Sequence, residues 1–323
     1  MKKIFVGQLS KPIRLDKYLK NIFKNISREK IIFFIKQGKI KIKDKQKVKP
    51  SFLLKGGEEI YLDISDFKKS KKAFILEPQS LRPEPEILYE NEDLLIINKP
   101  AGVAVHPSLN NLNTPSLVNW LLGKYSFLAQ VGEDKLRPGI VHRLDKETSG
   151  VLVIAKNNSS FNYLKNLFKQ RKIKKKYVAL VRGELTNLKG EINLPLIRSQ
   201  KSPLKRKVVI GDIKEKKLKT ALTKYRVLKR LSGFTLLEII PETGRTHQIR
   251  VHLASIGFPV VGDKLYGKSK KSADLSLSRH FLHAQEISFL SPSGKMLEIK
   301  TSLPKELKNF LQQLKPKTPN RVD

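Results

Sequence analysis

The spacing of hydrophobic residues predicts a small N-terminal unit of two helices followed by strands, within residues 13–65. Apolar residues recur at helical spacing from Leu15 to Ile22, and a second helical stripe follows Ser27, a residue type that caps helix N-termini. Residues 39–43 then alternate lysine and isoleucine, as a half-exposed strand does. Two short helices followed by basic strands are typical of a module that binds RNA.

Residues 66–86 show little hydrophobic periodicity and contain a lysine cluster and three prolines, which predicts a linker. From residue 87 to 310 short apolar runs typical of strands alternate irregularly with helical stripes. This mixture favours an α+β fold with a mixed, mainly antiparallel central sheet and flanking helices. Residues 311–323 are polar and predict a frayed tail.

Specific elements can be located within the longer region. Strands are predicted at 94–97, 151–155 and 177–181, and a hairpin within 220–240 turns at Ser232-Gly233. Thr114-Pro115 has the form of an N-cap followed by proline at the first helical position.

The charge of the chain points to a polyanionic partner. Lysine and arginine number 65 against 29 acidic residues, a net charge of +36, while 39% hydrophobic residues suffice for a folded core. So many positive charges repel one another unless a polyanion neutralises them. Nucleic acid is a suitable partner, because it releases counterions when its phosphates are neutralised. An anionic membrane surface is the competing partner, but no basic amphipathic helix stands out to favour it.

The absence of cysteine excludes disulfides, thiolate nucleophiles and cysteine-bound zinc. The basic and apolar start breaks at Gly7-Gln8, too early for a signal peptide, and no stretch approaches the roughly 20 apolar residues of a membrane span. The sequence therefore predicts a cytoplasmic protein that does not enter a membrane.

One acidic residue stands out as a candidate for chemistry. Asp145 lies in the segment His142–Gly150, between arginine and lysine neighbours and just before an apolar strand. A carboxylate in so basic a setting is available as a nucleophile or base. Taken alone, the segment fits a surface salt bridge or a turn better than a catalytic site.

A second candidate segment runs from Gly244 to His252. Thr246 is expected to cap a helix, and Arg250 lies beside its apolar face, so a buried Arg250 needs a carboxylate partner. Asp145 is the candidate partner. The two histidines of the segment are five residues apart and no glutamate follows the first, which favours capping or core hydrogen bonds over zinc binding.

Residues 262–269 match the phosphate-loop pattern G-x-x-x-x-G-K-[ST] in form only. Lysine, leucine and tyrosine fill the loop interior, and no amphipathic helix follows, so nucleotide binding is not expected. Tyr177 begins a strand after a basic run, which suits either an ordinary strand aromatic or a platform for an unpaired base.

Five motifs taken in order resemble the RluA family of pseudouridine synthases, over about residues 86–300. They are Asn98–Gly102, His142–Gly150, Lys175–Tyr177, Gly244–His252 and Arg279–Ala284. With His106-Pro107 and Arg137–Val141, the chain is most similar to the RluD-type enzymes of the large-subunit (23S) ribosomal RNA. The N-terminal unit resembles the alpha-L RNA-binding module, although Asp44-Lys45 stands where that module often has an Asn-Gly turn.

The resemblance implies a function and a set of roles. It implies the pseudouridine synthase fold, with Asp145 as the catalytic aspartate and Arg143 as an aid to flipping the base. Tyr177 would pack on the target base, and Arg250 would pair with Asp145, with Arg245 a weaker candidate. No cofactor or metal is expected, because the isomerisation needs no redox change and no external group. The expected partner is large-subunit ribosomal RNA, bound by a monomer.

Weaker candidates for RNA contacts are Arg14, Lys17 and Arg28 in the N-terminal unit, and Arg245. Two other functions compete with uridine isomerisation. The charge and the N-terminal unit also fit a non-catalytic ribosomal RNA-binding assembly factor, and the phosphate-loop pattern would fit an NTPase whose nucleotide binding depends on Lys268.

Overall fold

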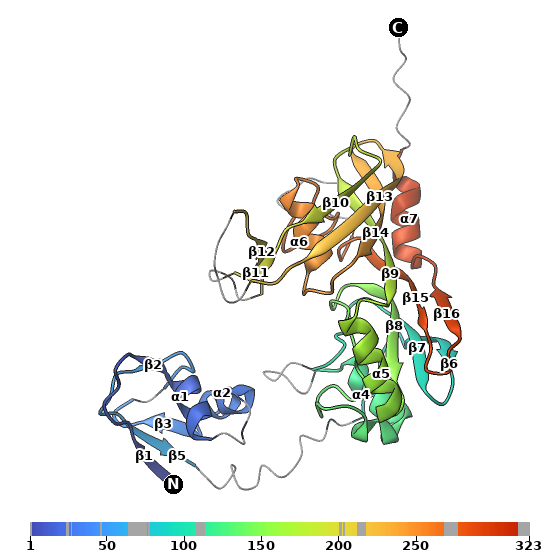
Figure 1. Ribbon diagram of the computed structural model, residues 1–323. Helices are drawn as coiled ribbons and strands as arrows, with labels where there is room; N and C mark the ends of the chain where they lie inside the picture. Colours follow the sequence, from blue (N-terminus) through green and yellow to red (C-terminus); the bar gives the residue numbers. More distant parts are fainter. Residues whose placement is uncertain are drawn as a thin grey trace. The chain divides into compact units, whose positions relative to one another are not determined.

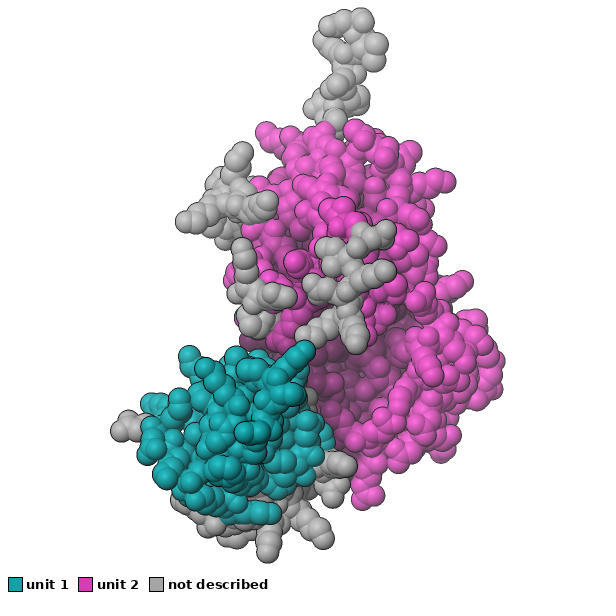
Figure 2. Space-filling view, turned by 60° about the vertical axis from the view of Figure 1, so that its left-hand side comes forward, with its two compact units in different colours: residues 1–76, 107–114 teal, residues 77–106, 115–323 magenta. Residues whose placement is uncertain are grey.

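The chain folds into two compact units, each described here by itself. In the computed structural model (Figure 1) the described residues are 2–23, 26, 28–45, 47–63, 76, 78–107, 114–199, 202, 204–211, 218–267 and 277–315. Unit 1 comprises residues 1–76 and 107–114, and unit 2 comprises residues 77–106 and 115–323 (Figure 2).

The elements of unit 1 are β1 (Lys2–Phe5), β2 (Ile13–Arg14), α1 (Leu15–Ile22), α2 (Arg28–Lys36), β3 (Ile40–Ile42), β4 (Leu53–Leu54) and β5 (Glu59–Leu62). Unit 2 begins with β6 (Glu86–Glu90), β7 (Leu94–Lys99), α4 (Leu117–Lys124), the 3-10 helix η1 (Ser126–Gln130), β8 (Ser149–Ala155) and α5 (Asn158–Lys169). It continues with β9 (Lys174–Arg182), β10 (Lys189–Asn193), β11 (Leu196–Arg198), β12 (Arg206–Val208), β13 (Leu222–Leu231) and β14 (Phe234–Pro241). The last elements are α6 (Gln248–Ser255), β15 (Leu282–Leu290), β16 (Met296–Lys300) and α7 (Lys305–Gln313).

Unit 1 packs α1 and α2 over a sheet of order β1-β5-β3, beside a short β2-β4 pair. The alternation predicted at 39–43 is confirmed, because Ile40 and Ile42 are buried on β3 while Lys41 is exposed. Ile22 is exposed, so the predicted apolar face of α1 ends one turn early. The predicted cap Ser27 lies outside the described residues.

The core of unit 2 is a sheet whose described strands follow the order β10-β13-β14-β9-β15-β8-β7-β6, with β16 paired to β15. Every pairing in it is antiparallel except the short parallel contact of β15 with β8. The α+β fold with a mixed, mainly antiparallel sheet is therefore confirmed. The strands and the hairpin predicted by periodicity are present as β7, β8, β9 and the β13–β14 pair.

Helices cover this sheet with the faces that their sequences make apolar. Phe161 and Leu164 are buried on α5, and α6 and α7 bury Leu253 and Phe310 in the core with β9, β14 and β15. α7 extends to Gln313, three residues into the stretch for which the sequence predicts a frayed tail. β6 begins at Glu86, the last residue of the predicted linker.

The start of α4 differs from its prediction. The helix begins at Leu117 with Ser116 as its N-cap, not at Thr114-Pro115. The cause is a long-range contact, because Leu117 N donates to Ala104 O (2.9 Å) while Ser116 N and Oγ meet the Asn119 side chain. Among the described residues, no helix is both long enough and apolar enough to cross a membrane.

Gly150 allows β8 and β15 to approach closely at the point where they run parallel. Its φ is +119°, and a Cβ built on it would lie 2.1 Å from the carbonyl oxygen of Ala284. Any side chain here would push the two strands apart, and it would displace the loop that precedes β8.

We predict that Gly150→Ala lowers the free energy of unfolding by about 4 kcal/mol or more, because backbone rather than a flexible side chain opposes the new methyl group. Gly102→Ala is the matched control, since Gly102 also has positive φ (+81°) but nothing within 4 Å of the built Cβ. The control should cost only about 1–2 kcal/mol of backbone strain. Equal losses for the two variants in urea unfolding would contradict the close-approach argument.

Candidate active site

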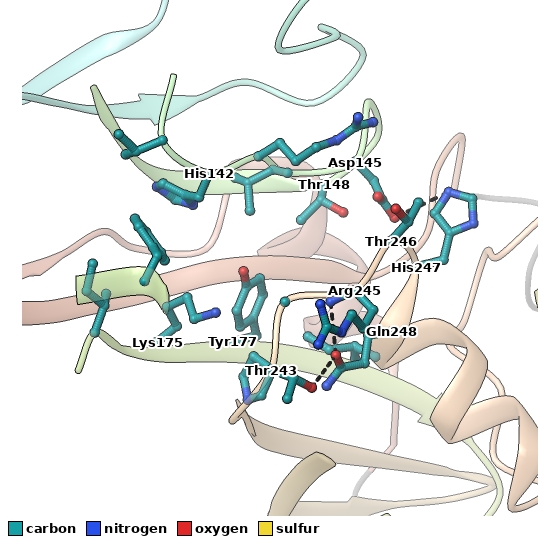
Figure 3. Close-up of a pocket in the computed structure, with 18 of the residues that line it drawn as sticks. His142, Asp145, Thr148, Lys175, Tyr177, Thr243, Arg245, Thr246, His247 and Gln248 are labelled. Atoms are coloured by element: carbon teal, nitrogen blue, oxygen red, sulfur yellow. Dashed lines mark hydrogen bonds and ion pairs between the residues drawn. The ribbon is translucent and has the colours of Figure 1, made fainter. Parts of the chain in front are cut away.

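A cavity of about 600 Å³ opens in unit 2 beside Asp145 (Figure 3). Most of its lining comes from three segments that are distant in sequence: the loop before β8, the start of β9, and the segment from the end of β14 into α6. The end of α5, His106 and Leu282 supply the rest. Residues singled out in the sequence line this one pocket, namely Arg143, Asp145, Tyr177, Arg245 and Arg250.

Asp145 is held by a buried chain of charges. Its Oδ2 accepts a hydrogen bond from Arg250 Nη1 at 2.8 Å, and Arg250 in turn grips Asp263 through Nε (2.7 Å) and Nη2 (2.8 Å). Arg250 is 5% exposed and Asp263 is 4% exposed. A bidentate pair fixes the plane of the guanidinium, so Arg250 presents its remaining nitrogen to Asp145 in one orientation.

The two carboxylates that flank Arg250 keep its guanidinium charged. Burial alone would disfavour the cation, but the hydrogen bonds and charge of Asp263, followed by the charge of Asp145, raise the pKa of Arg250 above its ordinary value. Burial also opposes the charge on Asp263, yet hydrogen bonds from Arg250 lower the pKa of that carboxyl. The backbone N–H groups of Leu265 and Tyr266 add donors to the same carboxylate.

Tyr266 packs against Arg250 and His247, and His247 in turn lies near Asp145. The guanidinium carbon of Arg250 lies 5.3 Å from the centre of the Tyr266 ring, a cation–π contact. Tyr266 Oη accepts from Arg206 N (2.8 Å) and lies 3.0 Å from His247 Nδ1, while His247 Nε2 is 3.9 Å from Asp145 Oδ2. His247 has a left-handed backbone (φ 58°), which is uncommon for a residue other than glycine.

Tyr177 and Arg143 complete the pocket around the carboxylate. Burial, followed by the charge of Asp145, raises the pKa of the Tyr177 hydroxyl, which therefore stays protonated and acts as a neutral aromatic surface. The exposed Arg143 side chain donates from Nη1 to His106 Nε2 (3.1 Å). His142, its neighbour, stacks on Phe168 with ring centres 4.7 Å apart, and accepts from Val153 N.

Two buried cations hold the loop that carries Asp145. Lys99 is fully buried, and its Nζ donates to the carbonyls of Pro100, Val103 and Lys146, which use all three N–H groups of an ammonium. Burial lowers the pKa of Lys99 to about 7, and the three carbonyl acceptors favour its charged form. Arg279, also buried, donates to Glu147 O (3.1 Å) and to Ser149 Oγ (3.0 Å).

Two buried histidines hold the same loop through its hydroxyl groups. His280 Nε2 lies 2.8 Å from Thr148 Oγ1, and His283 Nδ1 lies 2.9 Å from Ser149 Oγ. Burial lowers the pKa of His280 to about 3 and that of His283 to about 4, so both imidazoles are neutral at physiological pH. The loop is thus fixed on either side of its backbone before any substrate arrives.

The start of α6 also differs from its prediction. The helix begins at Gln248 after the left-handed His247, and Thr246 lies in a turn rather than at the N-cap. The buried Gln248 side chain determines this, because its Oε1 accepts from Thr243 Oγ1 (2.6 Å) and Arg245 N (3.0 Å). Arg245 is exposed and donates from Nε to Thr220 O, so it does not pair with Asp145.

The segment with the phosphate-loop pattern serves another purpose where it is described. Gly262 has φ +74° and packs against Arg279 O, and the following Asp263 is the carboxylate that orients Arg250. The sequence did not single out Asp263, Lys99 or Arg279. Lys99 and Arg279 lie within two of the five motifs and Asp263 within the phosphate-loop pattern, but nothing in these segments indicated a buried supporting role, since a charged residue is expected at the surface.

Among the weaker RNA-binding candidates of unit 1, two arginines are engaged within the unit. Arg14 and Arg28 both donate to the buried carboxylate of Asp16, with Nε distances of 3.0 Å each. Their side chains remain 40% exposed, so each guanidinium keeps N–H groups on the surface. Lys17 is exposed.

His252 is a core residue, with Nδ1 2.9 Å from Thr223 Oγ1 and Nε2 2.9 Å from Leu194 O. Within the described part of the chain, no group of three or more histidine, cysteine, aspartate or glutamate side chains has the arrangement of a metal site.

Two family models match the sequence. Residues 93–255 match the model of RNA pseudouridylate synthase, and residues 13–60 match the S4 domain. The first match spans the pocket segments from the loop before β8 to α6, and the second falls within unit 1.

Two similar proteins match over nearly the whole chain. An uncharacterized RNA pseudouridine synthase of Aquifex aeolicus is 38% identical, and the match covers 95% of both chains. The ribosomal large subunit pseudouridine synthase D of Zymomonas mobilis is 36% identical, and the match covers 93% of both. Among solved structures, the human RNA pseudouridylate synthase domain containing 1 superposes with a TM-score of 0.58 at 27% identity. That superposition covers 75% of this chain and 92% of the other.

The buried histidines predict a loss of stability in mild acid. Because the folded-state pKa values of His280 and His283 lie below the unfolded value of about 6.5, their contribution is fully present above pH 6.5. It is lost as the pH falls towards 4, since the unfolded chain binds protons that the folded chain does not. Between pH 7 and 5 each should cost on the order of 1–2 kcal/mol.

Chemical unfolding at pH 7 and pH 5, without RNA, checks this prediction. His280→Gln should reduce the difference between the two pH values, because one titrating group is removed. An equal free energy of unfolding at both pH values in the unmodified protein would contradict the assignment of neutral, buried imidazoles.

Proposed function

The chain belongs to the RNA pseudouridylate synthase family and isomerises uridine in RNA, and we propose that its substrate is large-subunit ribosomal RNA and its catalytic residue Asp145. The observation that carries the proposal is the position of Asp145, which lies at a pocket of about 600 Å³ and is oriented by a buried Arg250–Asp263 pair. The relatives named as large-subunit enzymes support the choice of RNA.

The reaction needs a fixed carboxylate and a site that holds a detached base. The N1–C1′ bond of uridine breaks, the uracil turns, the C5–C1′ bond forms, and the proton on C5 leaves while N1 gains one. Atoms and electrons balance without an oxidant, reductant or external group. A carboxylate beside C1′ stabilises the positive charge that develops there, or bonds to it, and the Arg250 contact determines where that carboxylate stands.

Access to C1′ requires the uridine to leave its stack, at a cost of a few kcal/mol. Arg143 extends from the loop of Asp145 at the exposed side of the pocket, where it can occupy the space that the base vacates. Tyr177 offers a neutral ring inside the pocket for the flipped base to pack on. These roles for Arg143 and Tyr177 are part of the proposal.

The rest of the chain supplies affinity for the polyanion. The net charge of +36 favours phosphate contacts throughout, and the S4 match supports an RNA-binding role for residues 13–65, joined by a linker (66–86) to a catalytic region at 87–310. Arg14, Lys17, Arg28 and Arg245 remain our candidates for phosphate contacts. Arg14 and Arg28 could contact phosphates only through the N–H groups that are not bonded to Asp16.

The two rival functions are less well supported. In the phosphate-loop pattern, Asp263 is committed to Arg250, and Lys268 lies outside the described residues. A non-catalytic assembly factor would have no need of a buried guanidinium aimed at a carboxylate in a pocket, which is costly to build.

We predict that Asp145→Asn abolishes pseudouridine formation, with a loss of at least about 1,000-fold in single-turnover rate, because the amide carries no negative charge for C1′. RNA affinity should change less than about threefold. The rate is measured by tritium release from large-subunit ribosomal RNA labelled at uridine C5. Glu298→Gln, which alters an exposed ion pair with Lys300 away from the residues that line the pocket, is the control. Retained turnover by Asp145→Asn, or no tritium release by the unmodified protein, would contradict the proposal.

A further inference from the structure

Lys175 is a lysine inside the pocket for which the reaction described so far has no use. It lies two residues before Tyr177 on β9, and since alternate residues of a strand share a face, both side chains point into the pocket (Figure 3). Its Nζ reaches across from β9 towards the segment after β14, where a Cβ built on Gly244 would be 3.9 Å away.

Within the described residues, the side chain of Lys175 forms no hydrogen bond or ion pair, although its backbone pairs with Ile287 of β15. Its nearest aromatic contact is loose, with Nζ 6.0 Å from the centre of the Phe168 ring. Glu242 is the acidic group whose charge acts on it, but that carboxylate pairs with Lys224 at 3.0 Å. The neighbouring lysines behave differently, because Lys176 pairs with Glu286 and Lys174 is exposed.

An ammonium in this position is costly to the free protein. Burial lowers the pKa of Lys175, which means that the pocket disfavours its charge when nothing is bound. A side chain that only had to fill this space would be apolar. The ammonium is therefore placed for an acceptor that arrives with the substrate.

We propose that Lys175 is a second catalytic residue, whose ammonium donates a hydrogen bond to a carbonyl oxygen of the flipped uracil on Tyr177. This inference rests on the proposed function of the pocket. Lys175 and Tyr177 are adjacent on one face of β9, so a base packed on the tyrosine ring presents its edge to the lysine.

The chemistry gives this contact a purpose. When the N1–C1′ bond breaks, its electron pair stays on uracil, and the negative charge spreads from N1 onto the two carbonyl oxygens. An ammonium beside one of these oxygens stabilises that charge. The Asp145 carboxylate would thus stabilise the positive charge at C1′, and the Lys175 ammonium would stabilise the negative charge on the base.

The test compares Lys175→Met with Lys174→Met in the full-length protein. Methionine keeps the length of the side chain but removes its charge and donors. For Lys175→Met we expect the single-turnover rate at saturating ribosomal RNA to fall by about 100-fold or more, the loss typical of one missing oxyanion donor, with RNA Kd within about threefold of the unmodified protein. Lys174→Met should react at the normal rate.

Thermal unfolding separates this role from a structural one. Since no hydrogen bond or ion pair holds the partly buried ammonium, the Tm of Lys175→Met should equal or exceed that of the unmodified protein. A lower Tm would make Lys175 a structural residue and overturn the inference. A rate within about twofold of normal, or a loss confined to Kd and matched by Lys174→Met, would overturn it as well. If the unmodified protein itself forms no pseudouridine, the proposed function fails, and not this inference alone.

Discussion

The architecture of the pocket depends on one buried interaction, the bidentate pair between Arg250 and Asp263. A buried guanidinium is costly unless its donors are satisfied, and here two carboxylates share them. Asp263 takes two donors and fixes the plane, so the third defines the position of Asp145. The segment after Gly262 must therefore reach α6, and the loop before β8 must bring Asp145 to the same guanidinium.

A second set of buried polar groups fixes the position of the loop that carries Asp145. Lys99 and Arg279 bind the carbonyls of Lys146 and Glu147, and two neutral histidines hold the next two hydroxyl side chains. The catalytic loop is thus held through its own backbone, which leaves the Asp145 carboxylate free to face the pocket. Such preorganisation suits a reaction whose rate depends on fixed charges rather than on a bound cofactor.

Sequence periodicity was sufficient for the strands and helices, but not for their ends or for the supports of the site. β7, β8 and β9 follow from local hydrophobic runs, whereas α4 and α6 begin where contacts outside the helices set their starts. Leu117 N donates to Ala104 O, and the Gln248 side chain bonds Thr243, Arg245 N and Leu222 O. Asp145 and Arg250 could be singled out from ordered motifs. The supporting roles of Asp263, Lys99 and Arg279 could not be predicted, although the last two lie within the motifs, because a charged residue is buried only when the tertiary fold brings it acceptors or a counter-ion, and local patterns do not show that.

The measurement that tests this account most directly is the single-turnover rate of Asp263→Asn on large-subunit ribosomal RNA. This variant leaves every group that would touch the uridine in place, and removes only the charge that orients Arg250. The account predicts a stability loss of about 3–5 kcal/mol, as for a broken buried pair. It also predicts a rate at least tenfold lower in the folded protein at saturating RNA, with RNA affinity retained. A folded Asp263→Asn protein that forms pseudouridine at the normal rate would contradict it.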